Sequence, residues 1–162
     1  MFVRGKVWKF GDDINTDLII PGKYLELGND EVSDFAMSGI DPDFTKKIKI
    51  GDVIVAGKNF GSGSSRETAP IAIKGSGIAC VIAESFSRIF FRNAINIGLP
   101  IAEIKNTSAI RTGEMIEVYI EEGKVICESG EIYESSKIAE DILLILQSGG
   151  LMPYILKHNK GE

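Results

Sequence analysis

The sequence contains little of the chemistry that most metal and nucleophile sites require. Among its 162 residues are two cysteines, Cys80 and Cys127, and one histidine, His158. Two isolated cysteines are too few for a structural zinc site or an iron–sulfur cluster. Both lie in apolar runs, IACVIA and KVICES, so we expect them to be buried as small apolar residues. We expect His158, near the C-terminus, to be solvated. Ser/His and Cys/His catalysis would then lack a base, and we expect no metal site in this chain.

Long apolar runs and an excess of basic residues are also missing. Without a stretch of about 18 apolar residues, no membrane-spanning helix is expected. Residues 1–13 place a glycine and charges where a signal peptide keeps its apolar segment. The net charge is −5, with no basic tail, which argues against nucleic-acid binding. We therefore expect a cytoplasmic protein that binds neither nucleic acid nor a membrane. Because the overall charge is negative, any anionic ligand must be attracted by a local positive site.

The length suits one folded unit, which we expect to span residues 1–162. Apolar runs, glycines and helical spacing predict the following elements. Strands are expected over 2–10, 52–60, 78–84 and 99–104, a hairpin over 114–130, helices over 31–38, 66–75, 85–98 and 136–150, and a loop over 18–30. Strands and helices alternate through the middle third, which favours a parallel β-layer with helices packed on it. The predicted fold class is α/β, a single compact domain with a parallel β-layer, flanking helices and added β-strands.

The segment 58–67, KNFGSGSSRE, carries more polar groups than a strand–helix turn requires. Its glycines allow close backbone approach to a ligand, and Ser64 and Glu67 have capping-box spacing, which predicts a helix beginning at Ser64. The first N–H groups of a helix lack internal partners and, with the helix dipole, favour an anion. Arg66 can grip a planar carboxylate with two hydrogen bonds. A Walker loop and a G-x-G-x-x-G pattern are both absent, and an ordinary turn with a good cap is the alternative interpretation.

The same residues carry a resemblance to a known family. Residues 59–67, NFGSGSSRE, resemble the signature of the swivelling β/β/α domain of the aconitase superfamily, especially the separate small subunits of isopropylmalate isomerase and homoaconitase. Segments that agree with this family in order and spacing are 11–17 (GDDINTD), 21–25 (PGKYL), 85–90 (SFSRIF) and 93–100. The resemblance covers nearly the whole chain.

This resemblance implies a hydro-lyase whose active site is shared between two chains. A large subunit is expected to hold a [4Fe–4S] cluster, in a heterodimer or heterotetramer, and the substrate is a small di- or tricarboxylate. By resemblance, Ser64 is the base that removes the proton next to a carboxylate, and Asp17 is an acidic residue near the catalytic centre. Arg66 clamps a substrate carboxylate, and Ser65 with neighbouring N–H groups, including that of Gly63, completes the contacts. A serine base requires a lowered pKa, to which Arg66 and a helix N-terminus contribute.

The substrate specificity loop of this family is similar to residues Tyr24, Leu25, Glu26 and Leu27. In single-chain aconitases, an arginine in the corresponding region binds a third carboxylate of the substrate. This sequence has no arginine in that region. Glu26 would repel an additional carboxylate, while Leu27 suits an alkyl group. This favours isomerisation of 2-isopropylmalate to 3-isopropylmalate, in leucine biosynthesis, over homoaconitase or a related hydro-lyase. A non-catalytic anion-binding or regulatory module is the alternative of another class.

Two further arginines, Arg88 and Arg92, are spaced to share one face of the helix expected over 85–98. An ordinary solvated helix face is one interpretation of this pattern. Contact with the large subunit is the other interpretation.

Overall fold

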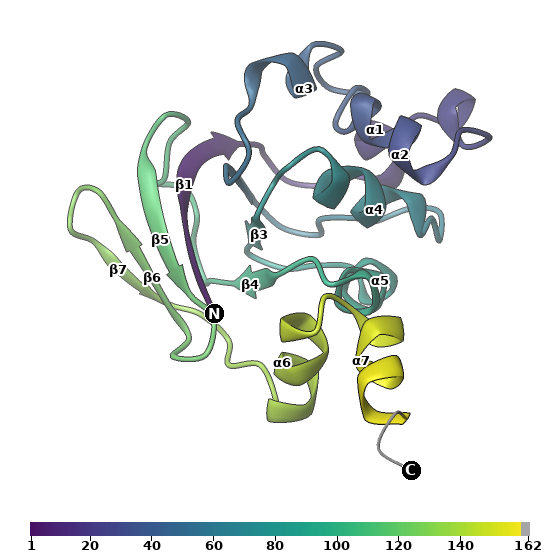
Figure 1. Ribbon diagram of the computed structural model, residues 1–162. Coiled ribbons are helices and arrows are strands. Elements are labelled where there is room, and N and C mark those ends of the chain that lie inside the picture. Colours follow the sequence, from purple (N-terminus) through teal and green to yellow (C-terminus); the bar gives the residue numbers. More distant parts are fainter. Residues whose placement is uncertain (160–162) are drawn as a thin grey trace.

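The computed structural model describes residues 1–159 and consists of a curled mixed sheet with helices on one side (Figure 1). The strands are β1 (Phe2–Lys9), β2 (Val53–Ala56), β3 (Cys80–Ala83), β4 (Ile101–Glu103), β5 (Met115–Tyr119), β6 (Lys124–Cys127) and β7 (Ile132–Glu134). The helices are α1 (Thr16–Ile19), α2 (Asn29–Val32), α3 (Phe44–Lys47), α4 (Thr68–Gly75), α5 (Arg88–Ile97), α6 (Glu140–Gln147) and α7 (Leu151–His158). Two 3₁₀ turns, η1 (Gly22–Tyr24) and η2 (Ser33–Phe35), adjoin α2.

Strand β1 joins the two halves of the sheet, whose strand order is β4-β3-β2-β1-β5-β6-β7. Its end, from Val7 to Lys9, pairs in parallel with β2, and β2 and β3 continue the parallel ladder to β4. Its beginning, from Phe2 to Lys6, pairs antiparallel with β5, which continues through β6 to β7. One strand thus belongs to a parallel half and to an antiparallel half.

The curl of the sheet creates two apolar cores, one on each face of the parallel strands. Every residue of β2 and β3 is buried, as expected for strands covered on both sides. Alternate residues face opposite cores: Ile54 and Val81 contact the helices, whereas Val55 and Ile82 contact the antiparallel strands. β5 alternates between buried and partly exposed residues, as expected for a strand with one covered face. The molecule therefore has three layers, with the parallel strands in the middle.

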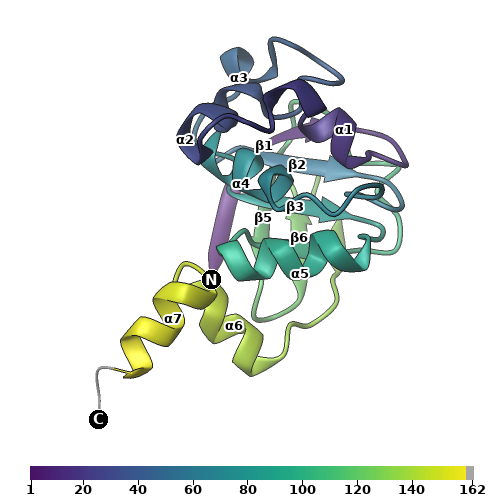
Figure 2. The same cartoon turned by 90° about the vertical axis from the view of Figure 1, so that its right-hand side faces the viewer.

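Local sequence sets both ends of α5, the longest described helix. The hydroxyl of Ser87 accepts a hydrogen bond from the Phe90 N–H and caps the N-terminus. Gly98 adopts φ +78° directly after the last helical residue, a conformation that glycine adopts readily. A Cβ at Gly98 would lie 2.5 Å from the backbone of Gly149, so the close approach of the α6–α7 connection also requires this glycine. Figure 2 shows α5 on the outside of the domain, with α6 and α7 below it.

The α/β class, the parallel middle strands, the hairpin of β5 and β6 and the helix α5 followed by Gly98 are confirmed. The loop predicted over 18–30 is wrong in part, because it contains η1 and the beginning of α2. The helix predicted over 31–38 is present as α2 and η2, which lie between 29 and 35. Helices α1, α3 and α7 and strand β7 were not predicted from the sequence, and the end of α1 also lies in the predicted loop.

The predicted capping box at Ser64 and Glu67 is also wrong. Helix α4 begins at Thr68, with Glu67 at its N-cap and no side-chain cap. Pro70 gives the reason, because proline has no N–H and its ring clashes with the carbonyl four residues earlier in a helix interior. A helix beginning after Ser64 would place Pro70 in its interior. With Thr68 as the first helical residue, Pro70 lies in the first turn, where no N–H is needed.

Gly61 offers a test of how tightly the site-bearing loop is packed. It adopts φ +80°, and an added Cβ would lie 2.3 Å from Cβ of Phe90. We expect Gly61→Ala to lower the free energy of unfolding by roughly 2–4 kcal/mol, since backbone strain and overpacking both act. Gly113→Ala is the matched control, because Gly113 has φ +98° but no atom within 4 Å of an added Cβ. Equal losses in urea unfolding of the two variants would contradict the packing argument.

Candidate functional site

Two segments far apart in the sequence are joined by backbone hydrogen bonds at the loop that follows β2. The N–H of Gly61 donates to the carbonyl of Ile14 at 2.7 Å, and the N–H of Thr16 donates to the carbonyl of Ser62 at 2.8 Å. Asn15, between them, caps α1 by accepting from the Leu18 N–H at 3.0 Å. The predicted motifs at 11–17 and 59–67 therefore form one structural unit.

The loop enters this unit through a left-handed residue, Asn59, at φ +60°. Asparagine is one of the few residues that adopts this conformation readily. Its N–H donates to the Ser85 hydroxyl at 2.8 Å, and its side-chain amide donates to the Asp13 carboxylate at 3.0 Å. These bonds fix the direction in which the chain leaves β2.

The back of the loop is anchored to the start of α5. The Ser87 hydroxyl donates to the carbonyl of Gly61 at 2.8 Å, and the Ser87 N–H donates to the carbonyl of Phe60 at 3.0 Å. The buried ring of Phe60 meets Phe86 and Phe90 edge-on, at centroid distances of 5.9 and 5.1 Å. Helix α5 and the loop are therefore a rigid pair, which suits a site that must hold a fixed geometry.

The outer part of the loop presents unpaired donors to solvent. Ser64 and Ser65 are exposed. Within residues 1–159, the N–H groups from Gly63 to Glu67 and the hydroxyls of Ser64 and Ser65 have no hydrogen-bond acceptor. The hydroxyl oxygen of Thr68, the first residue of α4, is buried without a hydrogen-bond partner. A row of free donors before a helix N-terminus is a favourable place for an anion.

Arg66 connects this loop to α1 and to the turn after it. Its Nη1 forms an ion pair with the Asp17 carboxylate and donates to the carbonyl of Ile20 at 3.1 Å. The Arg66 side chain is only 17% exposed, whereas that of Asp17 is 68% exposed. A Cβ added to Gly22 would lie 3.8 Å from Nη2 of Arg66, which places the turn of η1 beside the guanidinium. Since a guanidinium has five N–H donors, Arg66 keeps donors for a ligand.

The four residues predicted to set specificity divide into two pairs. Tyr24 stacks on Phe35 at a centroid distance of 4.0 Å, and Leu27 packs partly buried against the core beneath the helices. Leu25 and Glu26 are exposed, Leu25 to 37%. Of these four residues, Leu25 and Glu26 therefore face outward, while Leu27 contacts the protein interior.

The structure brings together Asp17, Arg66 and the turn of η1. It also places Gly63 beside Thr16: a Cβ added to Gly63 would lie 3.4 Å from Oγ1 of Thr16. Sequence reasoning missed Thr68 and the anchoring role of Ser87. Pro70 was the available signal for Thr68, since it restricts where the helix begins. Ser87 precedes the helical run as an N-cap type residue, but its bond to Gly61 carries no sequence signal.

Neither cysteine is suited to hold a cofactor. Burial raises the pKa of the Cys80 thiol to about 12, and burial followed by nearby glutamates raises that of Cys127 to about 11. The two lie on different strands, β3 and β6, and both are free thiols. No group of three or more potential metal ligands gathers among residues 1–159. An iron–sulfur cluster therefore does not fit the described part of this chain.

His158, at the end of α7, is exposed, and its Nδ1 lies 2.9 Å from the carbonyl of Tyr154. None of the helices in the described range 1–159 is long and apolar enough to cross a membrane.

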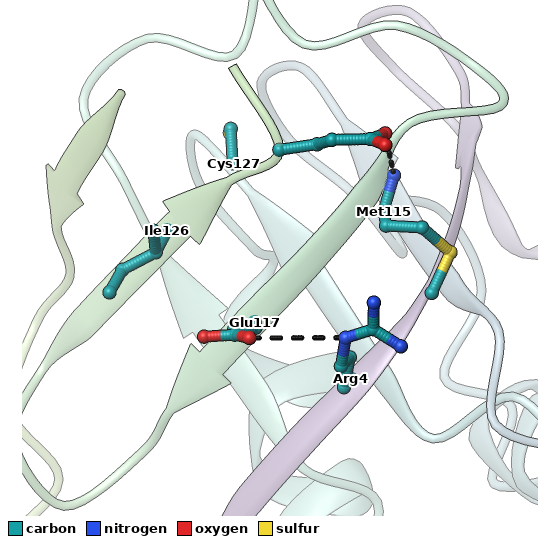
Figure 3. A pocket seen from close by; sticks show the side chains of 6 residues that line it. Arg4, Met115, Glu117, Ile126 and Cys127 are labelled. Carbon is teal, nitrogen blue, oxygen red and sulfur yellow. Dashed lines mark hydrogen bonds and ion pairs between the residues drawn. The ribbon is translucent and has the colours of Figure 1, made fainter. Parts of the chain in front are cut away.

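A separate hollow of about 240 Å³ lies on β1, β5 and β6 and contains none of the predicted site residues. Figure 3 shows the ion pair of Arg4 with Glu117 across it, at 3.9 Å. The hollow is lined by Arg4, Met115, Glu117, Ile126, Cys127 and Glu128. Its charged groups are already paired with neighbours on the adjacent strands, so the loop at 61–67 is the stronger candidate site.

Comparison with known proteins identifies a family that matches more than half of this chain. The profile of the family described as "Aconitase C-terminal domain" matches residues 14–106, which include α1, the turn of η1, the loop at 61–67 and α5. The matched range thus contains all the predicted site residues.

Relatives and a solved structure match over almost the full length. The isopropylmalate/citramalate isomerase small subunit of Methanocaldococcus jannaschii is 52% identical over 158 residues, covering 96% of this chain and 94% of that protein. The 3-isopropylmalate dehydratase small subunit of Halothermothrix orenii is 52% identical over 164 residues, covering 98% and 99%. The crystal structure of 3-isopropylmalate dehydratase from M. jannaschii aligns with a TM-score of 0.93 and 45% identity, covering 98% of this chain and 96% of that chain.

The two thiols offer a test of this description of the cysteines. A shift of the Cys80 pKa from 9.0 to about 12 reduces its thiolate fraction at pH 8 roughly 1000-fold. We expect a disulfide reagent at pH 8 to label the native chain slowly and the urea-unfolded chain at once, at two sites per chain. Cys80→Ser and Cys127→Ser chains assign each site. Rapid labelling of Cys80 in the native chain would contradict its burial.

Proposed function

This chain belongs to the family of the aconitase C-terminal domain, and we infer that it is the small subunit of a 3-isopropylmalate dehydratase, a hydro-lyase of leucine biosynthesis. The single observation in the structure that supports this role is an incomplete active site, with groups that bind an anion but none, in the described part of the chain, that bind a metal. Free N–H donors, two hydroxyls and a guanidinium gather at 63–68, while the described chain gathers no metal ligands.

The reaction is an isomerisation in two balanced steps. Water is first removed from 2-isopropylmalate, as a hydroxyl from one carbon and a proton from its neighbour, which leaves an unsaturated dicarboxylate. Water is then added in the opposite sense, with the hydroxyl on the neighbouring carbon, to yield 3-isopropylmalate. A site for this chemistry needs a base beside the proton, donors for two carboxylates and an acid for the departing hydroxyl.

We assign the acid to a large subunit that covers the loop at 61–67. We propose that this subunit holds a [4Fe–4S] cluster, which would supply the Lewis acidity for departure of the hydroxyl. The pair assembles as a heterodimer or heterotetramer in the cytoplasm, and residues 1–162 act as one swivelling domain that brings the base. Support comes from the names of the relatives as small subunits and from the family match.

We assign the base to Ser64. Its hydroxyl is exposed and has no hydrogen-bond partner in the described range 1–159, on a loop fixed at Gly61 and Ser62. A serine hydroxyl abstracts such a proton only as its alkoxide, so a bound state with a lowered pKa is required. Free N–H groups, the N-terminus of α4 and the guanidinium of Arg66 favour a negative charge here, and exclusion of water by the large subunit strengthens all three.

Arg66, Ser65 and the N–H of Gly63 bind a substrate carboxylate in this proposal. Asp17 acts on Arg66 by holding its Nη1, which fixes the orientation of the guanidinium plane. Bidentate binding of a planar carboxylate depends on such a fixed guanidinium. Asp17 also carries an exposed carboxylate at the same site.

The substrate is proposed to be a dicarboxylate with an alkyl group. Glu26 is exposed beside the turn of η1 and repels a third carboxylate, and exposed Leu25 can contact an alkyl group, a role predicted from the sequence for Leu27, which packs against the core instead. Both isopropylmalate and citramalate, named for one relative, are malates with an alkyl substituent. Homoaconitate has a third carboxylate and is the less favoured alternative. A non-catalytic anion-binding module is the alternative of another class, and the experiment on Ser64 separates it from the enzyme.

The Ser64 assignment is tested by Ser64→Ala, assayed with the iron–sulfur large subunit. We expect binding of the large subunit to remain normal while kcat falls at least 1000-fold, as for the loss of an essential base or nucleophile. Ser65→Ala is the matched control, and we expect it mainly to raise KM, because Ser65 binds substrate. If the wild-type chain gains no activity with the large subunit, the proposed enzymatic function is excluded. Near-normal turnover by Ser64→Ala would exclude Ser64 as the base.

The specificity assignment is tested by Glu26→Arg. Replacing an outward carboxylate by a guanidinium should raise kcat/KM for homoaconitate relative to isopropylmalate about 10- to 100-fold. Glu31→Arg, an exposed residue of α2, changes the charge equally and should leave the ratio unaltered. Steady-state assays on both substrates give the ratio. An unchanged ratio for Glu26→Arg would mean that this turn does not select the substrate.

A further inference from the structure

Helix α5 carries an exposed surface that the proposed catalytic roles do not use. Arg88, Ile89 and Arg92 are exposed on it, Ile89 to 47%, and we call these three residues the arginine face. Arg88 and Arg92 line a hollow of about 410 Å³, together with Phe86, Phe91 and Glu103. No helix or strand lies in front of α5 in Figure 2.

The two guanidiniums of this face have no partner among the residues that the structure describes. Neither Arg88 nor Arg92 forms an ion pair or a side-chain hydrogen bond with any residue in the range 1–159. This contrasts with Arg66, which is held by Asp17. The overall charge is −5, whereas this surface carries two arginines against one carboxylate, Glu103, in the hollow beside it. Complementarity therefore favours an acidic partner.

The composition of the face is typical of the centre of a protein interface. Arginine and aromatic residues are enriched there, and they contribute most of the binding energy when a partner removes water from them. Here two arginines and the rings of Phe86 and Phe91 line one hollow, and the exposed Ile89 lies on the same helix. A helix face that contacts only solvent does not need this exposed apolar surface.

The face also lies next to the site that a second chain must cover. Ser87, which precedes Arg88, donates to the carbonyl of Gly61, and Phe60 is hydrogen-bonded on both sides to the segment of Ser85 and Ser87. The loop that carries Ser64 and the start of α5 therefore move as one body. A large subunit that covers this loop comes close to the first turn of α5.

We propose that the arginine face of α5 is a docking surface for an acidic segment of the iron–sulfur large subunit. This inference rests on the proposed function, since it names where the partner of that same site binds. In the complex, Arg88 and Arg92 pair with carboxylates, while Ile89 and the ring of Phe91 are covered by apolar side chains. Docking here holds the loop with Ser64 against the large subunit.

The test is the double variant Arg88→Glu/Arg92→Glu, titrated against the large subunit under anaerobic conditions. We expect the Kd of the two subunits to rise at least tenfold by sedimentation or biolayer interferometry, while kcat at saturating large subunit stays near that of wild type. The milder Arg88→Gln/Arg92→Gln pair should bind with a weaker salt dependence than wild type, because two charge pairs are lost. Thermal melts of each variant show that the exposed substitutions leave the fold intact.

Arg4→Glu/Lys124→Glu is the matched control, because it changes the charge equally at exposed positions on β1 and β6. We expect its Kd to stay within twofold of wild type. Ser64→Ala should show the opposite pattern to the α5 variant, with normal Kd and lost turnover. These paired results separate docking from catalysis and from net charge.

Each other outcome overturns the proposal in a distinguishable way. If wild type binds and is active but Arg88→Glu/Arg92→Glu binds equally well, the docking surface is wrong and the proposed function stands. If the variant raises KM for substrate at unchanged subunit Kd, the face binds a small anion instead. If wild type neither binds the large subunit nor gains activity, the proposed function fails, and the docking surface fails with it.

Discussion

Two backbone hydrogen bonds, between Gly61 and Ile14 and between Thr16 and Ser62, support the geometry of the whole candidate site. They join a segment that follows β1 to a loop that follows β2, and the parallel pairing of these two strands brings the segments to the same edge of the sheet. Only with this join do Asp17 and Arg66, 49 positions apart, form an ion pair. Ligand sites at the carboxyl ends of parallel strands are a general property of such sheets.

The sequence was sufficient for the parts of the fold that depend on local or strictly periodic signals. Continuous apolar runs predicted β2 and β3, because strands covered on both faces need no polar alternation. Gly98 predicted the end of α5, since a left-handed residue there favours glycine. The loop motif identified the candidate site because its glycines, serines and arginine lie together in the chain.

Other features depend on contacts between distant segments and were not predicted. The ion pair of Arg66 with Asp17 and the bond from Ser87 to Gly61 require the folded arrangement of three segments. Helix α7 was not predicted, because Gly149 and Gly150 indicated only the end of the helix before them, whereas Gly150 also directly precedes the first residue of α7. The start of α4 was misplaced because capping-box spacing is common, whereas the constraint from Pro70 was decisive.

The outward position of Leu25 and Glu26 has a consequence for how such proteins can diverge. Neither side chain belongs to the two apolar cores, so substitutions there cost little free energy of unfolding. The loop with Ser64, in contrast, is packed against α5 at Gly61, where even one methyl group does not fit. After a gene duplication, selection can therefore change which carboxylic acid substrate is bound through single substitutions that each leave the fold stable. The loop that carries the proposed base, Ser64, is inherited unchanged.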